Sequence, residues 1–71
     1  MTKRTTGVVR WFDGSKGYGY IAAEDGEDVF VHYRDITGEE LSLLAEGEQV
    51  AFFLEFTAAH GPQATDVTPL N

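Results

Sequence analysis

The 71-residue sequence lacks several features, and each absence excludes a class of protein. It has no cysteine, which rules out disulfide bonds and thiol chemistry and fits a reducing cytoplasm. No apolar run approaches the roughly 20 residues that a membrane span needs. The opening MTKRTT has a basic pair with no apolar stretch behind it, so it is not a signal peptide. We therefore expect one small cytoplasmic domain without a membrane partner.

Positive charge is also scarce. The formal net charge is −7, and no lysine or arginine occurs from Thr37 onward. A chain of this charge repels a polyanion overall. If the protein binds nucleic acid, we expect the first half of the chain to do it, with charge as a minor driving force.

Strand patterns dominate what is present. Short β-branched and aromatic stretches, separated by turn residues, are typical of a small barrel or sandwich. Residues 1–5 are expected to form a flexible arm, and 6–71 a single domain. The predicted strands cover residues 6–13, 16–23, 28–33, 48–56 and 63–70.

The stretch from 34 to 47, RDITGEELSLLAEG, does not alternate. We interpret it as a long loop with a helical turn around Asp35. Its leucines Leu41, Leu43 and Leu44 are candidates to cap an open end of a barrel.

The stretch GSKGYGYI at 14–21 has the glycines and lysine of a phosphate-binding loop. In a Walker loop the lysine follows the last glycine and leads into a helix. Here Lys16 precedes Gly17, and a strand pattern follows. The dinucleotide fingerprint also fails, because its third glycine is missing. The stretch is therefore predicted to be a strand.

Side chains alternate across a sheet, and this gives the stretch a geometry. If a hairpin turns near Asp25, Tyr20 lies opposite Phe30 and Tyr18 lies opposite His32. Cross-strand neighbours are about 4.5–5.5 Å apart, so these rings form one patch. The opposite face is aliphatic and suits the core, and Gly19 permits a close approach by another strand. That face carries Ile21, Val29 and Val31.

Two interpretations of the ring patch remain. Clustered aromatic residues are often core, with the valines then facing a partner. His32 disfavours this, because a buried imidazole needs a hydrogen-bond partner. Exposed rings indicate a binding site, and unpaired bases stack on rings for about 1–3 kcal/mol each. Arg10 and Lys16 are placed to meet phosphates. A protein-interaction module that docks a basic partner on this patch is the rival.

Alternation leaves the first strand ambiguous. It places Trp11 with Val9 in the core and exposes Phe12, unless a bulge or strong twist turns Trp11 outward. In the second half, Phe52 is predicted to be core, and Phe53 points the other way, toward a barrel end.

Catalytic and metal sites are not predicted. The two histidines, His32 and His60, are far apart in sequence. No nucleophile, histidine and acid can be grouped above chance, and a domain this small has little room for a water-excluding pocket. We therefore expect no enzyme and no cofactor; the enzyme alternative, a small nuclease, predicts RNA cleavage.

Two motifs resemble a known family. KGYGYI and DVFVHY are similar to the two ribonucleoprotein motifs of the bacterial cold-shock domain, and VVRWFD and HGPQATDVTPL resemble its first and last strands. The resemblance runs from Thr6 to Leu70. It implies a five-stranded antiparallel OB-fold barrel that binds single-stranded RNA or DNA without catalysis. On this reading the protein is a monomeric nucleic-acid chaperone with no small-molecule substrate.

The resemblance also implies a nucleic-acid face, and it places Trp11 there, against simple alternation. Departures from the family pattern are Val8 for lysine, Asp13 for asparagine, Leu41 for phenylalanine and His60 for a basic residue. Each makes the face less positive or removes a ring, which lowers the expected affinity more than it changes the binding mode. The implied face comprises Arg10, Trp11, Phe12, Asp13, Lys16, Tyr18, Tyr20, Phe30, His32 and Tyr33, with Leu41 and His60 at the departing positions.

Overall fold

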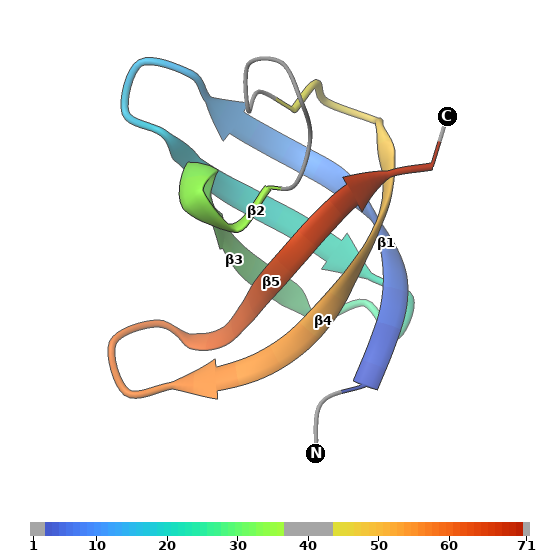
Figure 1. Ribbon diagram of the computed structural model, residues 1–71. Coiled ribbons are helices and arrows are strands. Elements are labelled where there is room, and N and C mark those ends of the chain that lie inside the picture. The colour runs from blue at the N-terminus through green and yellow to red at the C-terminus, as the bar shows by residue number, and fades with distance from the viewer. Residues whose placement is uncertain (1–2, 37–43, 71) are drawn as a thin grey trace.

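Figure 1 shows the computed structural model, which describes residues 3–36 and 44–70. Five strands form a closed barrel in the order β1-β2-β3-β5-β4, so the predicted all-β OB-fold barrel is confirmed. The helical turn expected around Asp35 is also present. The elements are β1 Lys3–Asp13, β2 Tyr18–Ala23, β3 Asp28–His32, the 3-10 helix η1 Tyr33–Asp35, β4 Gln49–Thr57 and β5 Gly61–Pro69. None of the described segments is a helix long and apolar enough to cross a membrane.

The barrel is mixed rather than purely antiparallel, which corrects the sequence expectation. β3 and β5 run parallel and pair at Phe30 and Gln63, with a further parallel bridge between Ile36 and Val67. The reason is parity. Strand directions cannot alternate all the way round a closed ring with an odd number of strands, so one neighbouring pair must be parallel. Here that pair is β3 and β5, which lie side by side in Figure 1.

Part of the expected N-terminal arm is strand. β1 begins at Lys3, and it pairs with β4 from Lys3 opposite Leu54 to Val8 opposite Gln49. Its later part pairs with β2. β1 therefore pairs with both of its neighbours, and residues 3–5, which were expected to be a flexible arm, belong to the sheet. Thr5 suits a strand, because β-branched residues favour extended backbone.

The aliphatic face of the β2–β3 hairpin enters the core, as the alternation predicted. Ile21, Val29 and Val31 are fully buried, as is Phe52. Leu44 is buried and packs against them, whereas Leu41 and Leu43 lie outside the described residues. Phe53 is half-buried, and its ring centroid lies 5.3 Å from Cζ of Arg4.

Candidate nucleic-acid interface

The β2–β3 hairpin places its rings on one face of the barrel. Tyr18 pairs with His32 and Tyr20 with Phe30, as the alternation predicted. The ring centroids of Tyr18 and Phe30 are 5.9 Å apart, with planes inclined by 26°. Those of Tyr20 and Phe30 are 5.7 Å apart and nearly perpendicular, at 76°. Both separations fall in the range of attractive aromatic pairs, so these rings make one connected surface.

A bulge in β1 adds Trp11 to this surface. The β1–β2 register moves from Val9 opposite Ile21 directly to Trp11 opposite Tyr20, so Arg10 is the extra residue. One extra residue reverses the faces of all that follow. Simple alternation was therefore wrong for Trp11, which is 39% exposed. Its ring centroid lies 5.9 Å from that of Tyr18 and 5.7 Å from that of Tyr20.

The same bulge turns Phe12 inward. Alternation predicted an exposed ring, but Phe12 is half-buried and packs against the core. It pairs with Gly19 on β2. A methyl group at Gly19 would lie 2.7 Å from Cα of Phe12 and would also collide with the carbonyl oxygen of Trp11. Gly19 thus permits the close approach that the sequence predicted, and this approach holds Trp11 beside Tyr20.

The ring of His60 lies flat on Phe30. The centroids are 3.9 Å apart and the planes differ by 9°. His60 comes from the turn between β4 and β5, where its backbone N–H donates to Oγ1 of Thr57 at 3.1 Å. Phe30 was expected to be an exposed ring, and this is wrong: it is 7% exposed, under His60 and against both tyrosines. His60 itself is exposed and forms the outer ring at this end.

His32 and Tyr33 extend the surface toward η1. Their ring centroids are 4.5 Å apart at 33°, and Tyr33 is 46% exposed. The backbone N–H of Tyr33 donates to the carbonyl oxygen of Gly17 at 2.8 Å, which ties η1 to the β1–β2 turn. Five rings are linked by ring contacts, and His32 and Tyr33 form a second pair that continues from Tyr18 through the β2–β3 register. We call these seven side chains the ring surface: Trp11, Tyr18, Tyr20, Phe30, His32, Tyr33 and His60.

The charged residues predicted for the site have distinct roles in the structure. Asp13 organises the β1–β2 turn, since its Oδ1 accepts from the N–H groups of Ser15 at 2.9 Å and Lys16 at 3.1 Å. Lys16 is exposed in that turn. Arg10 pairs with Asp28, with 3.5 Å between Nε and Oδ1. Asp28 therefore offsets part of the positive charge expected from Arg10.

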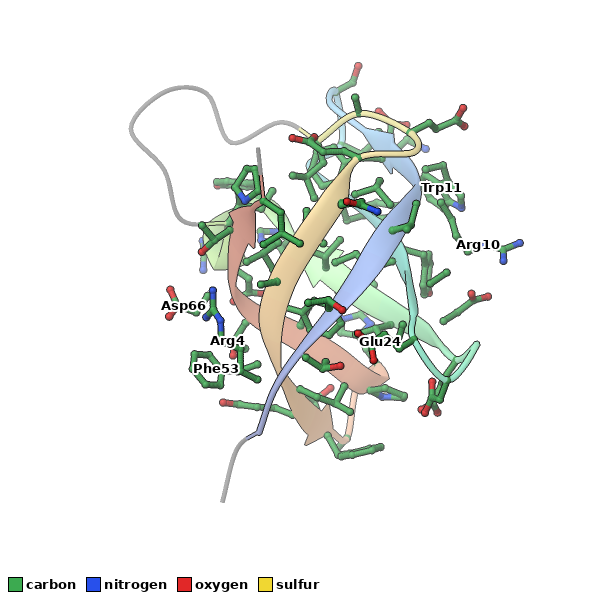
Figure 2. All side chains as sticks on the ribbon, turned by 90° about the vertical axis from the view of Figure 1, so that its right-hand side faces the viewer. Arg4, Arg10, Trp11, Glu24, Phe53 and Asp66 are labelled. Atoms are coloured by element: carbon green, nitrogen blue, oxygen red, sulfur yellow. The ribbon has the colours of Figure 1, made fainter. Side chains whose placement is uncertain are left out.

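Arg4 lies elsewhere. In Figure 2 it sits beside Phe53 and Asp66, on the opposite side of the barrel from the labelled Arg10 and Trp11. An arginine so placed cannot serve bases on the ring surface. Val8, where the family often has lysine, is 40% exposed on β1. Leu41 lies outside the described residues.

The structure adds residues that sequence reasoning missed. Beside His60 lies an open hollow of about 380 Å³, which we call the polar hollow. His32 and His60, distant in sequence, both border it. In the described parts of the chain, no three His, Asp or Glu side chains are grouped closely enough to hold a metal ion. The residues around the hollow are Phe30, His32, Arg34, Asp35, His60 and Gln63. Only the strand order could have placed Gln63 here, because it depends on β5 joining β3.

A closed five-stranded barrel in this order is an OB-fold, and here one of its faces carries connected rings. Residues 5–70 match the family described as "'Cold-shock' DNA-binding domain". The chain belongs to this cold-shock domain family, whose members are generally nucleic-acid binding.

Bacterial relatives match over nearly the whole chain. The cold shock-like protein CspA of Vibrio cholerae is 45% identical over 71 residues, which are 99% of this chain and 100% of the relative. The cold shock-like protein CspD of Bacillus cereus is 49% identical over 63 residues, covering 89% of this chain and 94% of the relative.

A solved structure, "drosophila Unr CSD456", has a TM-score of 0.74 at 21% identity. The match covers 97% of this chain but 27% of that longer chain, so it supports the fold alone.

Proposed function

We propose that this protein binds single-stranded RNA or DNA by stacking unpaired bases on the ring surface, and that it acts as a nucleic-acid chaperone. The observation that carries the proposal is the unbroken series of ring contacts from Trp11 through Tyr18 and Phe30 to His60. Monomeric proteins rarely leave such a surface open unless it binds something. Membership of a nucleic-acid-binding family makes a nucleic acid the appropriate ligand.

In this proposal, bases stack on the accessible rings, and buried rings support them. Trp11, Tyr33 and His60 are the exposed rings of the ring surface, whereas Tyr18, Tyr20 and His32 are half-buried. Tyr18 lies between Trp11 and Phe30. Phe30 acts through His60, which covers it. Phe12 supports the surface from inside the barrel rather than contacting a base.

Stacking must supply most of the free energy of binding, because cations are few. Lys16 and Arg34 are exposed near the ring surface, and Arg10 is shared with Asp28. Each stacked base contributes about 1–3 kcal/mol, so several bases give useful affinity without many phosphate contacts. Leu41 in place of a ring and a histidine at position 60 reduce this affinity without changing its mode.

The chaperone activity follows from mass action. A base stacked on the protein cannot pair, so binding to the unpaired strand shifts a hairpin toward its open form. Duplexes present no free base faces and are not ligands. No reaction is needed, and we expect a cytoplasmic monomer that acts without catalysis, cofactor or small-molecule substrate.

Trp11 provides the test, because it is the single tryptophan of the chain and lies on the ring surface. Titration with short oligothymidine should quench its fluorescence to saturation, whereas the matching duplex should not. Affinity falls with a log–log salt slope of about −0.7 per phosphate contact, so about two contacts give a slope near −1.5. A slope steeper than about −4 would refute binding dominated by stacking. Saturable quenching by a basic peptide instead of oligothymidine would favour a protein-interaction module.

A further inference from the structure

The polar hollow lies at the His60 end of the ring surface and has its own chemistry. One wall is the stacked pair of Phe30 and His60. The remaining border is polar and comes from two segments. One is the end of β3 with η1, the other is the start of β5, and the parallel β3–β5 contact brings them together. A site with both a ring wall and a polar edge can stack a base and also contact its hydrogen-bonding edge.

Hydrogen-bond acceptors on the border come from η1 and from β5. Nε2 of Gln63 donates to Oδ2 of Asp35 at 2.9 Å. A carboxylate only accepts, so Gln63 must turn its amide nitrogen toward Asp35, which leaves its own Oε1 as an acceptor. Asp35 keeps Oδ1 and the remaining lone pairs of Oδ2. Both side chains are half-buried, so hydrogen bonds to them are less exposed to competition from water.

Hydrogen-bond donors on the border come from the end of β3 and from η1. The backbone N–H of Arg34 donates to Nδ1 of His32 at 3.2 Å. A neutral imidazole whose Nδ1 accepts a hydrogen bond carries its proton on Nε2. His32 therefore offers an N–H group, and the guanidinium of Arg34 is a donor only. The polar hollow thus has both acceptors and donors on its border.

The charge on Asp35 also needs a reason. A carboxylate on a nucleic-acid face repels phosphates. Asp13 has a structural reason to be there, since it holds a turn, and Asp28 pairs with Arg10. The side-chain partner of Asp35 in the structure is the neutral amide of Gln63. A carboxylate here becomes favourable when it accepts hydrogen bonds from a base edge.

We propose that the polar hollow is a guanine-selective subsite, an inference that rests on the proposed function. Guanine carries two adjacent donors, N1–H and the 2-amino group, which suit the carboxylate of Asp35. It also carries the acceptors O6 and N7, which suit Arg34. Adenine and cytosine offer one amino donor on this edge, and uracil and thymine offer one N–H between two carbonyl oxygens that the carboxylate repels. Among the bases, guanine alone offers two adjacent donors for the carboxylate of Asp35 and two acceptors for the guanidinium of Arg34.

The test compares oligothymidines that carry one central guanine, hypoxanthine or adenine, with Trp11 fluorescence as the readout. Hypoxanthine is guanine without the 2-amino group. We expect the guanine strand to bind about tenfold more tightly than the hypoxanthine strand, the usual size of one good base-edge contact. Equal affinity for guanine and hypoxanthine on the unaltered protein would overturn the inference, and this comparison needs no variant.

A variant separates base recognition from a structural role. The bond between Asp35 and Gln63 also fastens η1 to β5, and a purely structural role would change stability and all affinities alike. Asp35→Asn keeps an oxygen that accepts from Gln63 but loses the charge and the paired acceptors. It should abolish the preference for guanine over hypoxanthine while oligothymidine affinity changes less than about threefold.

Glu27→Gln is the matched control, because it removes the same charge just before β3, at the strand end away from the polar hollow. It should keep the guanine preference, and Asp35→Asn keeping it would overturn the inference. If oligothymidine itself fails to bind the unaltered protein, both the proposed function and the inference that rests on it are refuted. If oligothymidine binds without a guanine preference, only the inference fails.

Discussion

His60 covers Phe30 ring on ring, at 3.9 Å and 9°, although thirty positions separate them in the sequence. The contact leaves Phe30 only 7% exposed. In the proposed binding mode, a base that arrives at this end of the ring surface meets an imidazole first, with a phenyl ring beneath it. We therefore expect the two residues to act as one platform, in which Phe30 supplies rigidity and His60 supplies the contact.

This arrangement predicts the effect of changing His60. His60→Phe keeps a flat ring on Phe30 and should leave oligothymidine affinity within about twofold. His60→Ala removes the outer ring but uncovers Phe30, so the loss should lie near the low end of the range for one stacked base, about 1 kcal/mol. Tryptophan fluorescence titration measures both.

Phe56→Ala is the control, since this ring is 72% exposed on β4 and is not part of the ring surface. It should leave the affinity unchanged. A His60→Ala protein that binds as tightly as the unaltered chain would show that bases do not use this platform.

Variants of Tyr18 distinguish the contribution of ring stacking from that of the hydroxyl group. Tyr18→Phe retains the ring between Trp11 and Phe30 and should change affinity only modestly. Tyr18→Ala should weaken binding by about 1–3 kcal/mol, the cost of one lost stacking ring. Thermal unfolding of both variants checks that the barrel is intact. Similar losses in the two variants would mean that the hydroxyl group, not the ring, carries the contribution.

The pairing of Arg10 with Asp28 makes a prediction about salt. The pair is exposed, with side chains 58% and 53% accessible, so it adds little stability. Asp28→Asn should release Arg10 to phosphate, tighten oligothymidine binding and steepen the salt slope by about 0.7, the value for one added contact.

Glu27→Gln removes the same charge from the neighbouring residue without touching Arg10, and its slope should stay as in the unaltered protein. If both variants changed the slope equally, net charge rather than the freed arginine would be the cause.

Gly19 predicts a stability effect that reaches the ring surface. A Cβ atom added at Gly19 would lie 2.7 Å from Cα of Phe12. Because this neighbour is backbone, it cannot move aside as a flexible side chain would. Gly19→Ala should therefore lower the free energy of unfolding by about 1–3 kcal/mol, and it should displace Trp11 and weaken binding. Urea denaturation followed by titration measures the two effects.

Gly26 offers a comparison in the β2–β3 turn. It has a φ of +89°, and nothing lies within 4 Å of an added Cβ. Asparagine tolerates this conformation, so the free energy of unfolding of Gly26→Asn should stay within about 0.5 kcal/mol of that of the unaltered protein. A Gly19→Ala protein as stable as Gly26→Asn would contradict the close β1–β2 approach.

Strict alternation was enough to predict the β2–β3 hairpin. Tyr18 and Tyr20 face His32 and Phe30 as expected, and the valines of β3 enter the core. This worked because the side chains of a regular strand have a period of two, and this hairpin has no bulge. Alternation failed in β1 because one extra residue at Arg10 reverses the faces of Trp11 and Phe12. The residue pattern allowed a bulge that turns Trp11 outward but could not decide for it, whereas the family resemblance placed Trp11 on the nucleic-acid face.

Long-range contacts were beyond sequence reasoning. The contact of His60 with Phe30 depends on a parallel pairing between β3 and β5, which no local pattern encodes. The hydrogen bond from Gln63 to Asp35 has the same origin. The extension of β1 to Lys3 likewise depends on the distant β4, which is long enough to pair with it.

The parallel β3–β5 contact has a consequence for a chain still being synthesised. Trp11, Tyr18 and Phe30 are translated early, but the imidazole that covers Phe30 and the glutamine that reaches Asp35 arrive with the final hairpin. A nascent chain that has not passed residue 63 thus holds its platform unfinished and its barrel open. Under the proposed function, a chain can bind a strand at this end of the ring surface only after the last hairpin has joined the barrel, so we expect early nascent chains not to bind the messenger that encodes them.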